Sequence, residues 1–217
     1  MKYVIKAICA AAVLALLPGC TGGSTGGMFG SSYSVRALAP HDPSKVHVKV
    51  STSTQNIYVL EGDRLLMAVQ GCVGEHGCTP LGNHHIFSKI REKRSGSFGF
   101  DEQGNGADIH LGQRVAVGYP MAFWCEFVPA YGFHEGFVWS EPRTHGCIRM
   151  HKEAAARFFA LVRIGTPVNV AVSQPEDQQY GHTVRKLDQR NDPNPPTSHM
   201  MSRSYFQDPA GPLLIKE

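Results

Sequence analysis

Only one segment of the sequence has the apolar spacing of an α-helix, and this restriction narrows the choice of folds. Within residues 152–163, apolar side chains recur at helical intervals on one face: Ala155, Phe158, Phe159 and Val162. Gly165 and Pro167 follow, which is typical of a helix end. Most other apolar residues of the central chain fall in short runs rich in Val, Ile and aromatic residues. The sequence therefore predicts a mostly β domain with one main helix packed on it.

The predicted strands lie in the central part of the chain. They occupy residues 46–50, 55–60, 65–70, 85–87, 121–127 and 167–172. Gly62 and Asp63, between the second and third of these, are typical of a tight hairpin turn. Residues 98–112 are rich in glycine and polar residues, which predicts a long loop or an irregular hairpin. Residues 45–173 together have the size of one ordinary domain.

The N-terminus has the pattern of an export signal. Lys2 and Lys6 form a basic start, and an apolar run follows at residues 7–17. This run is shorter than the roughly 20 residues that a membrane-spanning helix needs, so residues 1–19 are predicted to be a signal peptide. The run ends in Leu-Pro-Gly followed by Cys20, which resembles the bacterial lipobox and predicts lipidation of Cys20.

Both segments that flank the predicted domain are expected to lack a packed structure. Residues 20–44, rich in Gly, Ser and Thr with some Pro, predict a flexible tether that carries the lipid at its first residue. Residues 174–217 are polar and contain Pro193, Pro195 and Pro196, which interrupt helices and strands. We therefore expect this C-terminal segment to be an extended, disordered tail.

The charge and the histidine spacing exclude several kinds of partner. The chain has 21 Lys and Arg against 18 Asp and Glu, a formal net charge of +3. No segment has the basic density that binding to nucleic acid requires, so no nucleic acid is expected. Arg91, Lys93 and Arg94 are interpreted as a solvated turn. The histidines and cysteines lack the paired spacings of metal sites, so neither a metal nor another cofactor is predicted.

A cysteine shortly before the predicted helix is the candidate nucleophile. Because Cys147 lies close to the helix N-terminus, we expect the helix dipole to favour its thiolate. The backbone N–H groups around Gly146 and Cys147 are candidates for holding an oxyanion. His134, which lies upstream between glycines, is the candidate base, since a cysteine and a histidine form the minimum nucleophile and base pair.

Two segments resemble those of a known enzyme family. Thr-His-Gly-Cys-Ile-Arg at residues 144–149, preceded by His134 and followed by the helix, resembles the signature of the L,D-transpeptidase catalytic domain family. Residues 78–87 resemble the earlier Thr-Pro-x-Gly segment of that family. The resemblance covers residues 57–172, and it implies a β-sandwich or barrel of antiparallel strands.

The resemblance implies a reaction on bacterial peptidoglycan. Family members transfer acyl groups of stem peptides at the bond between a diamino acid and a D-amino acid, forming crosslinks or exchanging the terminal D-residue. Cys147 matches the nucleophile that forms a thioester. His134 matches the base, which the backbone carbonyl of Glu135 would orient. The other matching positions are Thr144, His145 and Gly146 beside the oxyanion site, and Arg149, which contacts substrate or braces the site.

The implied setting is the cell envelope, and alternatives to transfer remain open. A lipid anchor would hold the enzyme on a membrane, in the periplasm, where it would serve cell wall biogenesis and cell shape. Only residues 135–143 separate His134 from Thr144, which is short for the family. A more open site would suit hydrolysis, by an L,D-carboxypeptidase or by an amidase that releases wall-linked protein. A non-catalytic wall-binding lipoprotein is a further alternative. A papain-like protease is disfavoured, because its cysteine precedes its histidine.

The six cysteines divide by position. Cys9 would leave with the signal peptide, whereas Cys20 and Cys147 have the roles already given. Cys72, Cys78 and Cys125 would remain in an oxidising compartment. A disulfide between Cys72 and Cys78 is compatible with the sequence, and Cys125 is either a buried free thiol or the disulfide partner of one of these two. The spacing does not choose between these pairings.

Overall fold

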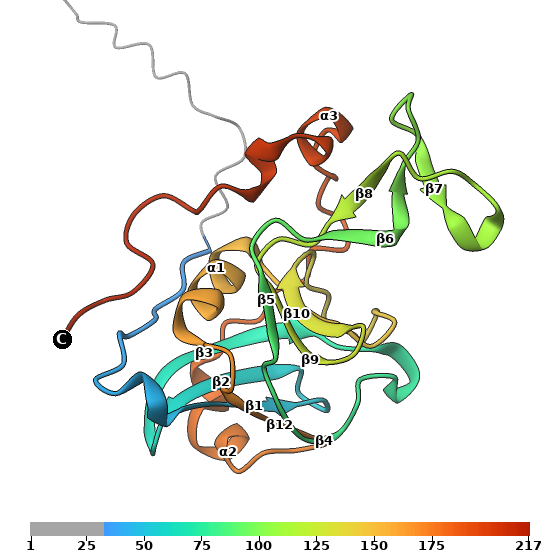
Figure 1. Cartoon of the computed structure of the whole chain (residues 1–217). Coiled ribbons are helices and arrows are strands. Elements are labelled where there is room, and N and C mark those ends of the chain that lie inside the picture. The colour runs from blue at the N-terminus through green and yellow to red at the C-terminus, as the bar shows by residue number, and fades with distance from the viewer. Residues whose placement is uncertain (1–32) are drawn as a thin grey trace, which may run out of the picture. The chain divides into compact units, whose positions relative to one another are not determined.

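The computed structural model of the protein describes residues 33–217, which form one compact unit (Figure 1). The predicted signal peptide and Cys20 lie outside the described residues, as does most of the predicted tether. Within the described part, no helix is both long enough and apolar enough to cross a membrane.

The core of the fold is a nine-stranded sheet in the order β4-β12-β1-β2-β3-β11-β10-β9-β5. Its strands are β1 (Val46–Ser51), β2 (Asn56–Glu61), β3 (Arg64–Cys72), β4 (Gly82–His85), β5 (Ser88–Ile90), β9 (Trp124–Val128), β10 (Tyr131–Glu135), β11 (Ile148–Met150) and β12 (Pro167–Ala171). Neighbouring strands are antiparallel except for two pairs, β1 with β12 and β10 with β11, which are parallel. The predicted mostly β, antiparallel-rich fold is confirmed.

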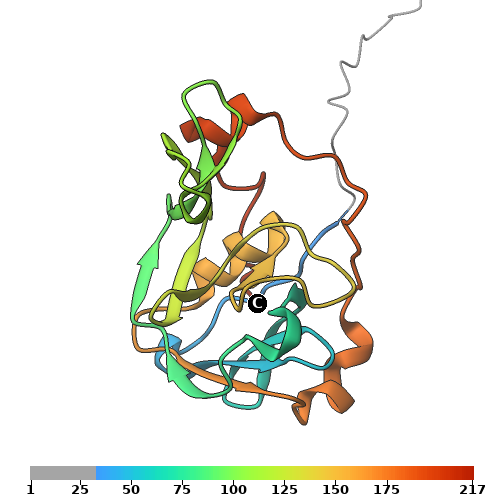
Figure 2. The ribbon, with the colours of Figure 1, turned by 90° about the vertical axis from the view of Figure 1, so that its right-hand side faces the viewer.

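A second, three-stranded sheet projects from one end of the molecule (Figures 1 and 2). Its strands, in the order β7-β6-β8, are β6 (Arg94–Phe100), β7 (Gly106–Asp108) and β8 (Val117–Pro120), and a 3₁₀ turn, η3 (Ile109–Leu111), follows β7. We call these elements the small sheet. Residues 98–112 thus form the irregular hairpin that their composition predicts.

Helix α1 (Lys152–Leu161) confirms the predicted helix and ends two residues earlier than expected. Val162 already has an extended backbone, and its N–H donates to the carbonyl of Phe158. The ammonium group of Lys89 donates to the carbonyls of Phe159 and Val162, at 2.7 and 2.6 Å. A cation therefore satisfies the C-terminal carbonyls of the helix. The ring of Phe158 packs on that of Phe133, with 4.5 Å between centroids, which fixes α1 against β10.

Two strand boundaries differ from the sequence-based expectation. Residues 85–87 do not form one strand, because the buried Ile86 connects the end of β4 with the start of β5, and its N–H donates to Thr166. Residues 121–127 are likewise interrupted, since Phe123 has a positive φ of 60° and β9 begins only at Trp124. In both places a buried apolar residue sits at a bend, and periodicity alone does not distinguish this from a strand.

The remaining helical elements are short. They are η1 (Pro43–Lys45), η2 (Glu75–Gly77), α2 (Glu176–Tyr180), η4 (Gly181–Thr183), α3 (Thr197–Met201) and η5 (Arg203–Phe206). Most of them lie in the C-terminal segment, which was expected to be disordered and is instead packed. Met200, Tyr205 and Phe206 are buried in the main core. A few apolar residues in a polar, proline-containing segment carry this packing, which average composition does not reveal.

The described part of the predicted tether also packs on the domain. Ala37 and Leu38 are buried, and the N–H of Leu38 donates to the carbonyl of Leu66 on β3 at 3.0 Å. Leu38 also bridges to Ile215 near the C-terminus. The two ends of the packed unit therefore lie side by side, and it extends beyond residues 45–173 in both directions.

Candidate active site

The parallel pair β10–β11 brings the predicted nucleophile and base to one face of the sheet. In its register, Phe133 pairs with Ile148 and His134 pairs with Arg149. Phe133 and Ile148 are fully buried in the core. Since successive residues of a strand point to opposite faces, His134 and Arg149 face away from the core. Cys147, which directly precedes Ile148, lies on the same face as these two.

His134 is held in one tautomer by the backbone. Its Nδ1 lies 2.7 Å from the carbonyl oxygen of Glu135, so Nδ1–H donates and Nε2 is left as the acceptor. The pKa of His134 lies at about 4, below its usual 6.5, because burial and, to a smaller extent, Arg149 lower it against the opposing effect of the Glu135 hydrogen bond. The imidazole is therefore neutral at pH 7, as a general base must be. The expected orientation of His134 by the Glu135 carbonyl is confirmed.

Cys147 is a neutral thiol in the resting structure rather than a thiolate. Burial raises its pKa, and the smaller effects of the Gly132 backbone and of Arg149 lower it. The prediction that the helix dipole favours the Cys147 thiolate is wrong, because β11 lies between Cys147 and α1. The influence of a helix end is limited to about the first turn. Together with the low pKa of His134, this describes a neutral thiol and a neutral imidazole rather than an ion pair.

Two threonine hydroxyls shape the backbone that carries Cys147. Thr144 Oγ1 accepts from the Gly146 N–H at 3.0 Å and donates to the Cys147 carbonyl at 2.5 Å. Thr79 Oγ1 accepts from the Gly74 N–H at 2.8 Å and donates to the Gly146 carbonyl at 3.0 Å. Because Thr144 already engages the Gly146 N–H, this group is not free to hold an oxyanion in the resting site.

Arg149 is a half-buried cation without an acidic partner. Among the described residues, no carboxylate lies within ion-pair distance of its guanidinium group, although it is near enough to Cys147 and His134 to lower the pKa of each. The aliphatic part of the side chain runs past Gly136, where a β-carbon would lie 2.8 Å from Arg149 Cδ. A positive charge is therefore available beside the candidate pair.

The small sheet touches the motif through His145. This histidine is exposed, and its ring centroid lies 5.9 Å from that of Phe98 on β6. Phe98 also lies 5.8 Å from the ring of His110 on η3. His110 thus belongs to the small sheet and not to the β10–β11 pair beside Cys147.

The motifs in this arrangement agree with a match to a family model. The L,D-transpeptidase catalytic domain, YkuD, matches residues 45–170. The chain belongs to this family. The matched region includes Cys147, His134 and both threonines, as well as the small sheet, and it ends before the C-terminal segment.

Several solved L,D-transpeptidase structures resemble the chain at low identity. One from Stackebrandtia nassauensis is 18% identical with a TM-score of 0.47, and the match covers 64% of this chain and 60% of that one. L,D-transpeptidase 1 of Mycobacterium tuberculosis is 21% identical with a TM-score of 0.42, covering 58% and 61%. The chain thus spans about three fifths of the length of these proteins. No curated protein matches the sequence.

Gly146 of this L,D-transpeptidase domain has no room for a side chain. Its φ is +120°, and an added β-carbon would overlap the Tyr131 ring and lie 2.8 Å from the Cys78 carbonyl oxygen. We expect Gly146→Ala to lower the free energy of unfolding by about 1–3 kcal/mol, as overpacking does, and to displace Cys147. Urea unfolding and the rate of reaction on muropeptides measure both effects.

Gly165→Ala is the matched control for that variant. Gly165 also has a positive φ, of +89°, but no atom lies within 4 Å of its added β-carbon. Gly165 lies beyond α1. Its substitution by alanine should lower the free energy of unfolding by only about 1 kcal/mol, through backbone strain, and should leave the reaction rate unchanged. Equal effects of the two substitutions on the rate would contradict the crowding of Gly146 by Tyr131.

The four described cysteines are all free. Cys72 and Cys125 are buried, and burial raises the pKa of Cys125 to about 12. Cys78 is exposed, so the Cys72–Cys78 disulfide left open by the sequence is not formed in this structure. Within residues 33–217, no group of three or more His, Cys, Asp or Glu side chains could hold a metal ion.

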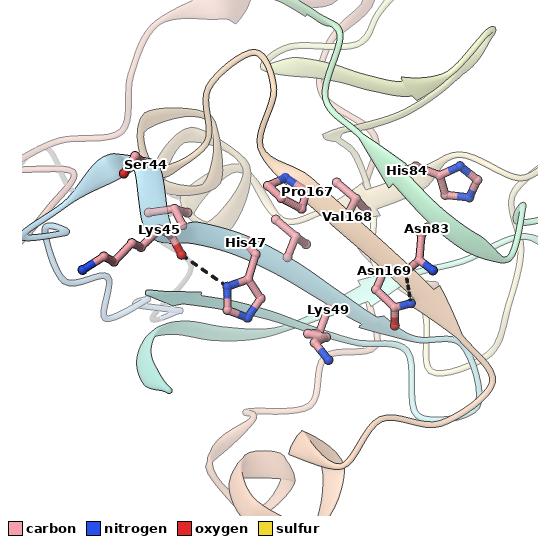
Figure 3. A pocket seen from close by; sticks show the side chains of 11 residues that line it. Ser44, Lys45, His47, Lys49, Asn83, His84, Pro167, Val168 and Asn169 are labelled. Carbon is pink, nitrogen blue, oxygen red and sulfur yellow. Dashed lines mark hydrogen bonds between the residues drawn. The ribbon is translucent and has the colours of Figure 1, made fainter. Parts of the chain in front are cut away.

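A separate hollow of about 430 Å³ lies where β1, β12 and β4 meet (Figure 3). Asn169 donates to Asn83 across it at 2.7 Å, and His47 and Lys49 lie along β1. None of the predicted site residues lines this hollow. Lys49 on its rim lies 3.8 Å from Glu176, and Lys45 lies 3.8 Å from Asp42. We assign no part of the chemistry to it.

The buried groups beside the site predict an unusual pH dependence of stability. Burial lowers the pKa of His134 to about 4 and raises that of Glu135 to about 7. His134 therefore binds fewer protons in the folded than in the unfolded chain below pH 6.5, and its contribution to stability is lost as the pH falls. Glu135 binds more protons when folded above pH 4.5, and its contribution is lost as the pH rises.

These two effects should offset each other in the wild type, and Glu135→Gln should expose the first. We expect this variant to lose roughly 3 kcal/mol of unfolding free energy between pH 6.5 and 4, from the shift of the His134 pKa. Arg149 faces His134, whereas Lys152 and Tyr205 face Glu135 and stay in place. Urea unfolding over this pH range measures the effect. A flat profile in Glu135→Gln would contradict the low pKa of His134.

Sequence reasoning assigned no role to Thr79 or Tyr131, which together hold Gly146. Thr79 entered the sequence analysis only as part of the Thr-Pro segment. Its hydroxyl donates to the Gly146 carbonyl, 67 positions further along the sequence. Tyr131 was one of several aromatic residues near His134. Neither contact follows from local spacing, because both depend on how β10, β11 and residues 74–79 meet in space.

Proposed function

We propose that this protein catalyses cysteine-dependent acyl transfer on peptidoglycan stem peptides, at the bond between a diamino acid and a terminal D-amino acid. The observation that carries the proposal is the parallel pairing of β10, which carries His134, with β11, which Cys147 directly precedes. The fixed tautomer of His134 supports it, since Nε2 is the nitrogen free to accept a proton. Membership of the L,D-transpeptidase family supplies the substrate class.

In the first step, His134 Nε2 takes the Cys147 thiol proton as the sulfur attacks the carbonyl carbon of the diamino acid. A neutral thiol and a neutral imidazole suit this order, because charge forms only when substrate is present. The C–N bond to the D-amino acid then breaks, and His134 returns the proton to the departing amine. The product is a thioester on Cys147.

In the second step, an amine of another stem peptide or a free D-amino acid attacks the thioester. His134 accepts the proton of the attacking amine and returns it to the Cys147 sulfur as the C–S bond breaks. The unpaired guanidinium of Arg149 is suited to a carboxylate of the stem peptide. Of the oxyanion donors suggested by the sequence, the Cys147 N–H is the candidate that remains, because Thr144 engages Gly146.

The proposed location is the periplasmic side of the cell envelope. Residues 1–19 would direct export, and a lipid on Cys20 would anchor the chain to a membrane. From Cys20 to the first described residue, Tyr33, the chain is rich in glycine. Such a segment would let the domain reach stem peptides near the membrane surface. Labelling with a radioactive fatty acid tests this, and retained label in Cys20→Ala would contradict the anchor.

Muropeptide analysis tests the reaction. The purified chain is incubated with a disaccharide tetrapeptide and a D-amino acid, and products are identified by mass spectrometry. Transfer predicts crosslinked dimers and D-amino acid exchange. Tripeptides alone would establish hydrolysis by the same pair, and released wall-linked protein would establish the amidase alternative. The absence of any product with intact, alkylatable Cys147 would contradict an enzymatic role.

A further inference from the structure

The segment formed by α3 and η5, residues 197–206, lies outside the family match but is tightly packed. We call it the C-terminal brace. Its side chains Met200, Tyr205 and Phe206 are buried to at least 94%. Figures 1 and 2 both show α3 beside the small sheet, and α3 packs on β8. A segment added beyond the matched residues thus contributes to the core next to the candidate site.

Arg94, predicted to be solvated, instead holds the brace onto the small sheet. Its guanidinium group donates to the carbonyls of Met200, Met201 and Ser202, at 3.0, 3.0 and 3.1 Å. It also donates to the Gly118 carbonyl on β8 at 2.8 Å. These bonds use the rigid fork of an arginine, and a lysine could not reproduce them. One side chain on β6 therefore ties together two strands and the brace.

Tyr205 connects the brace with the strand that carries His134. Its carbonyl accepts from Lys152 Nζ at 3.2 Å, and its side chain interacts with the carboxyl group of Glu135. That carboxyl is buried, and its Oε2 has no hydrogen-bond partner among the described residues. The backbone carbonyl of Glu135 is the group that holds His134 Nδ1. Tyr205 is thus linked to His134 through a single residue.

Strand β6 connects Arg94 with the segment that carries Cys147. Arg94 and Phe98 both lie on β6, and the Phe98 ring lies against His145. His145 directly precedes Gly146 and Cys147. Release of Arg94 from the brace would therefore free the strand that contacts His145, whereas loss of the Tyr205 hydroxyl would act on the side of His134.

We propose that the C-terminal brace supports the active site from outside it, with Arg94 and Tyr205 as positioning residues that hold the small sheet against His145 and steady Glu135, whose backbone orients His134. Neither residue is placed in contact with substrate. The proposal deepens the proposed transfer reaction and rests on it for the turnover measurement, but its structural half can be measured without substrate.

The first test uses Arg94→Ala in the full chain. Amide hydrogen exchange over residues 94–120 should become at least tenfold faster, and kcat on the disaccharide tetrapeptide should fall at least tenfold with a smaller change in KM. Arg203→Ala is the matched control, because Arg203 lies in the brace, is highly exposed and, among residues 33–217, pairs only with Glu92 at 3.3 Å. It should keep exchange and turnover within twofold of the wild type.

The second test uses Tyr205→Phe, which keeps the buried ring and removes only the hydroxyl. The groups that face Glu135 are Tyr205, Lys152 on α1 and Tyr119 on β8, and Arg94 faces Tyr205. Since the Tyr205 interaction lowers the Glu135 pKa, its loss should move the titration near pH 7 upward. The pH profile of Cys147 alkylation by iodoacetamide, read by peptide mapping, measures this shift. Glu135→Gln should abolish the titration near pH 7. If the Tyr205 hydroxyl had a purely structural role, its loss would not shift that titration.

The outcomes separate the two proposals. If the wild type shows no turnover, the proposed function fails, while exchange and alkylation still decide the brace. If Arg94→Ala matches the wild type in exchange and turnover, the brace is overturned. If Arg94→Ala does not fold, Arg94→Lys should fold with faster exchange over residues 94–120, and exchange at the wild-type rate in that variant would overturn the brace. An unchanged alkylation profile in Tyr205→Phe would overturn the link to His134.

Discussion

Replacing Cys147 with alanine is expected to abolish the reaction on muropeptides, by about 10⁴-fold or more, because no covalent intermediate can form. Cys147 is half-buried on the face shared with His134 and Arg149, whereas Cys72, which pairs with Arg149 and therefore lies on the same face, is fully buried. The fold should survive, as the thiol makes only a long contact of 3.7 Å with the Ala130 carbonyl. The loss of rate would therefore report chemistry and not unfolding.

The control for Cys147→Ala is Cys78→Ala. Cys78 is the exposed thiol among the described cysteines and lies in the segment that touches Gly146 through its backbone carbonyl. Its side chain has no assigned role, so this variant should keep the wild-type rate. Mass spectrometry of the wild type with substrate should show an acyl adduct on Cys147 alone. Turnover retained by Cys147→Ala, or an adduct on Cys78, would contradict the assignment of the nucleophile.

Replacing His134 with alanine is expected to lower kcat by about 10²-fold or more, the usual size of a general-base contribution. The thiol of Cys147 has a raised pKa, so without a base little thiolate exists at pH 7. The residual rate of the variant should therefore increase with pH as hydroxide deprotonates the thiol. In the wild type, proton transfer to His134 makes the rate much less dependent on alkaline pH.

His110→Ala is the control for the base assignment. His110 lies on η3 against Phe98, outside the parallel pair. It should lose at most a few-fold in rate through its packing on the small sheet. Measuring kcat from pH 5 to 10 for both variants separates the roles. If His110→Ala is the slower variant, or if His134→Ala lacks the rise at alkaline pH, the base has been misassigned.

Patterns within short segments predicted the fold class and the main site residues. The short apolar runs of β1 and β2 and the helical stripe of α1 are local signals, and each of them corresponds to an element of the structure. The family resemblance pointed to Cys147 and His134, and the expected contact of His134 with the Glu135 carbonyl is present. These features depend on residues adjacent in sequence or on a motif, and both are readable without coordinates.

Features that depend on distant contacts were missed. In the sequence, Arg94 belongs to a basic segment that predicts a solvated turn, and Tyr205 belongs to a polar tail. Their positioning roles depend on the contact between Arg94 and residues 200–206. The state of the Cys147 thiol was also mispredicted, because β11 could not be distinguished from the start of α1. Burial, which raises the pKa of Cys147 and lowers that of His134, is a property of the assembled core.

The parallel pairing of β10 with β11 has a consequence for how such enzymes diversify. The spacing of nucleophile and base is set by inter-strand hydrogen bonds, about 4.8 Å between strands, and not by the segment that joins them in sequence. The buried Val138 anchors the joining segment to the fold, whereas its exposed part, residues 140–143, can be exchanged while the reacting atoms keep their positions. The catalytic pair and the exposed part of this segment are thus held by different contacts, so grafting that part between homologues tests its role in substrate choice without rebuilding the pair.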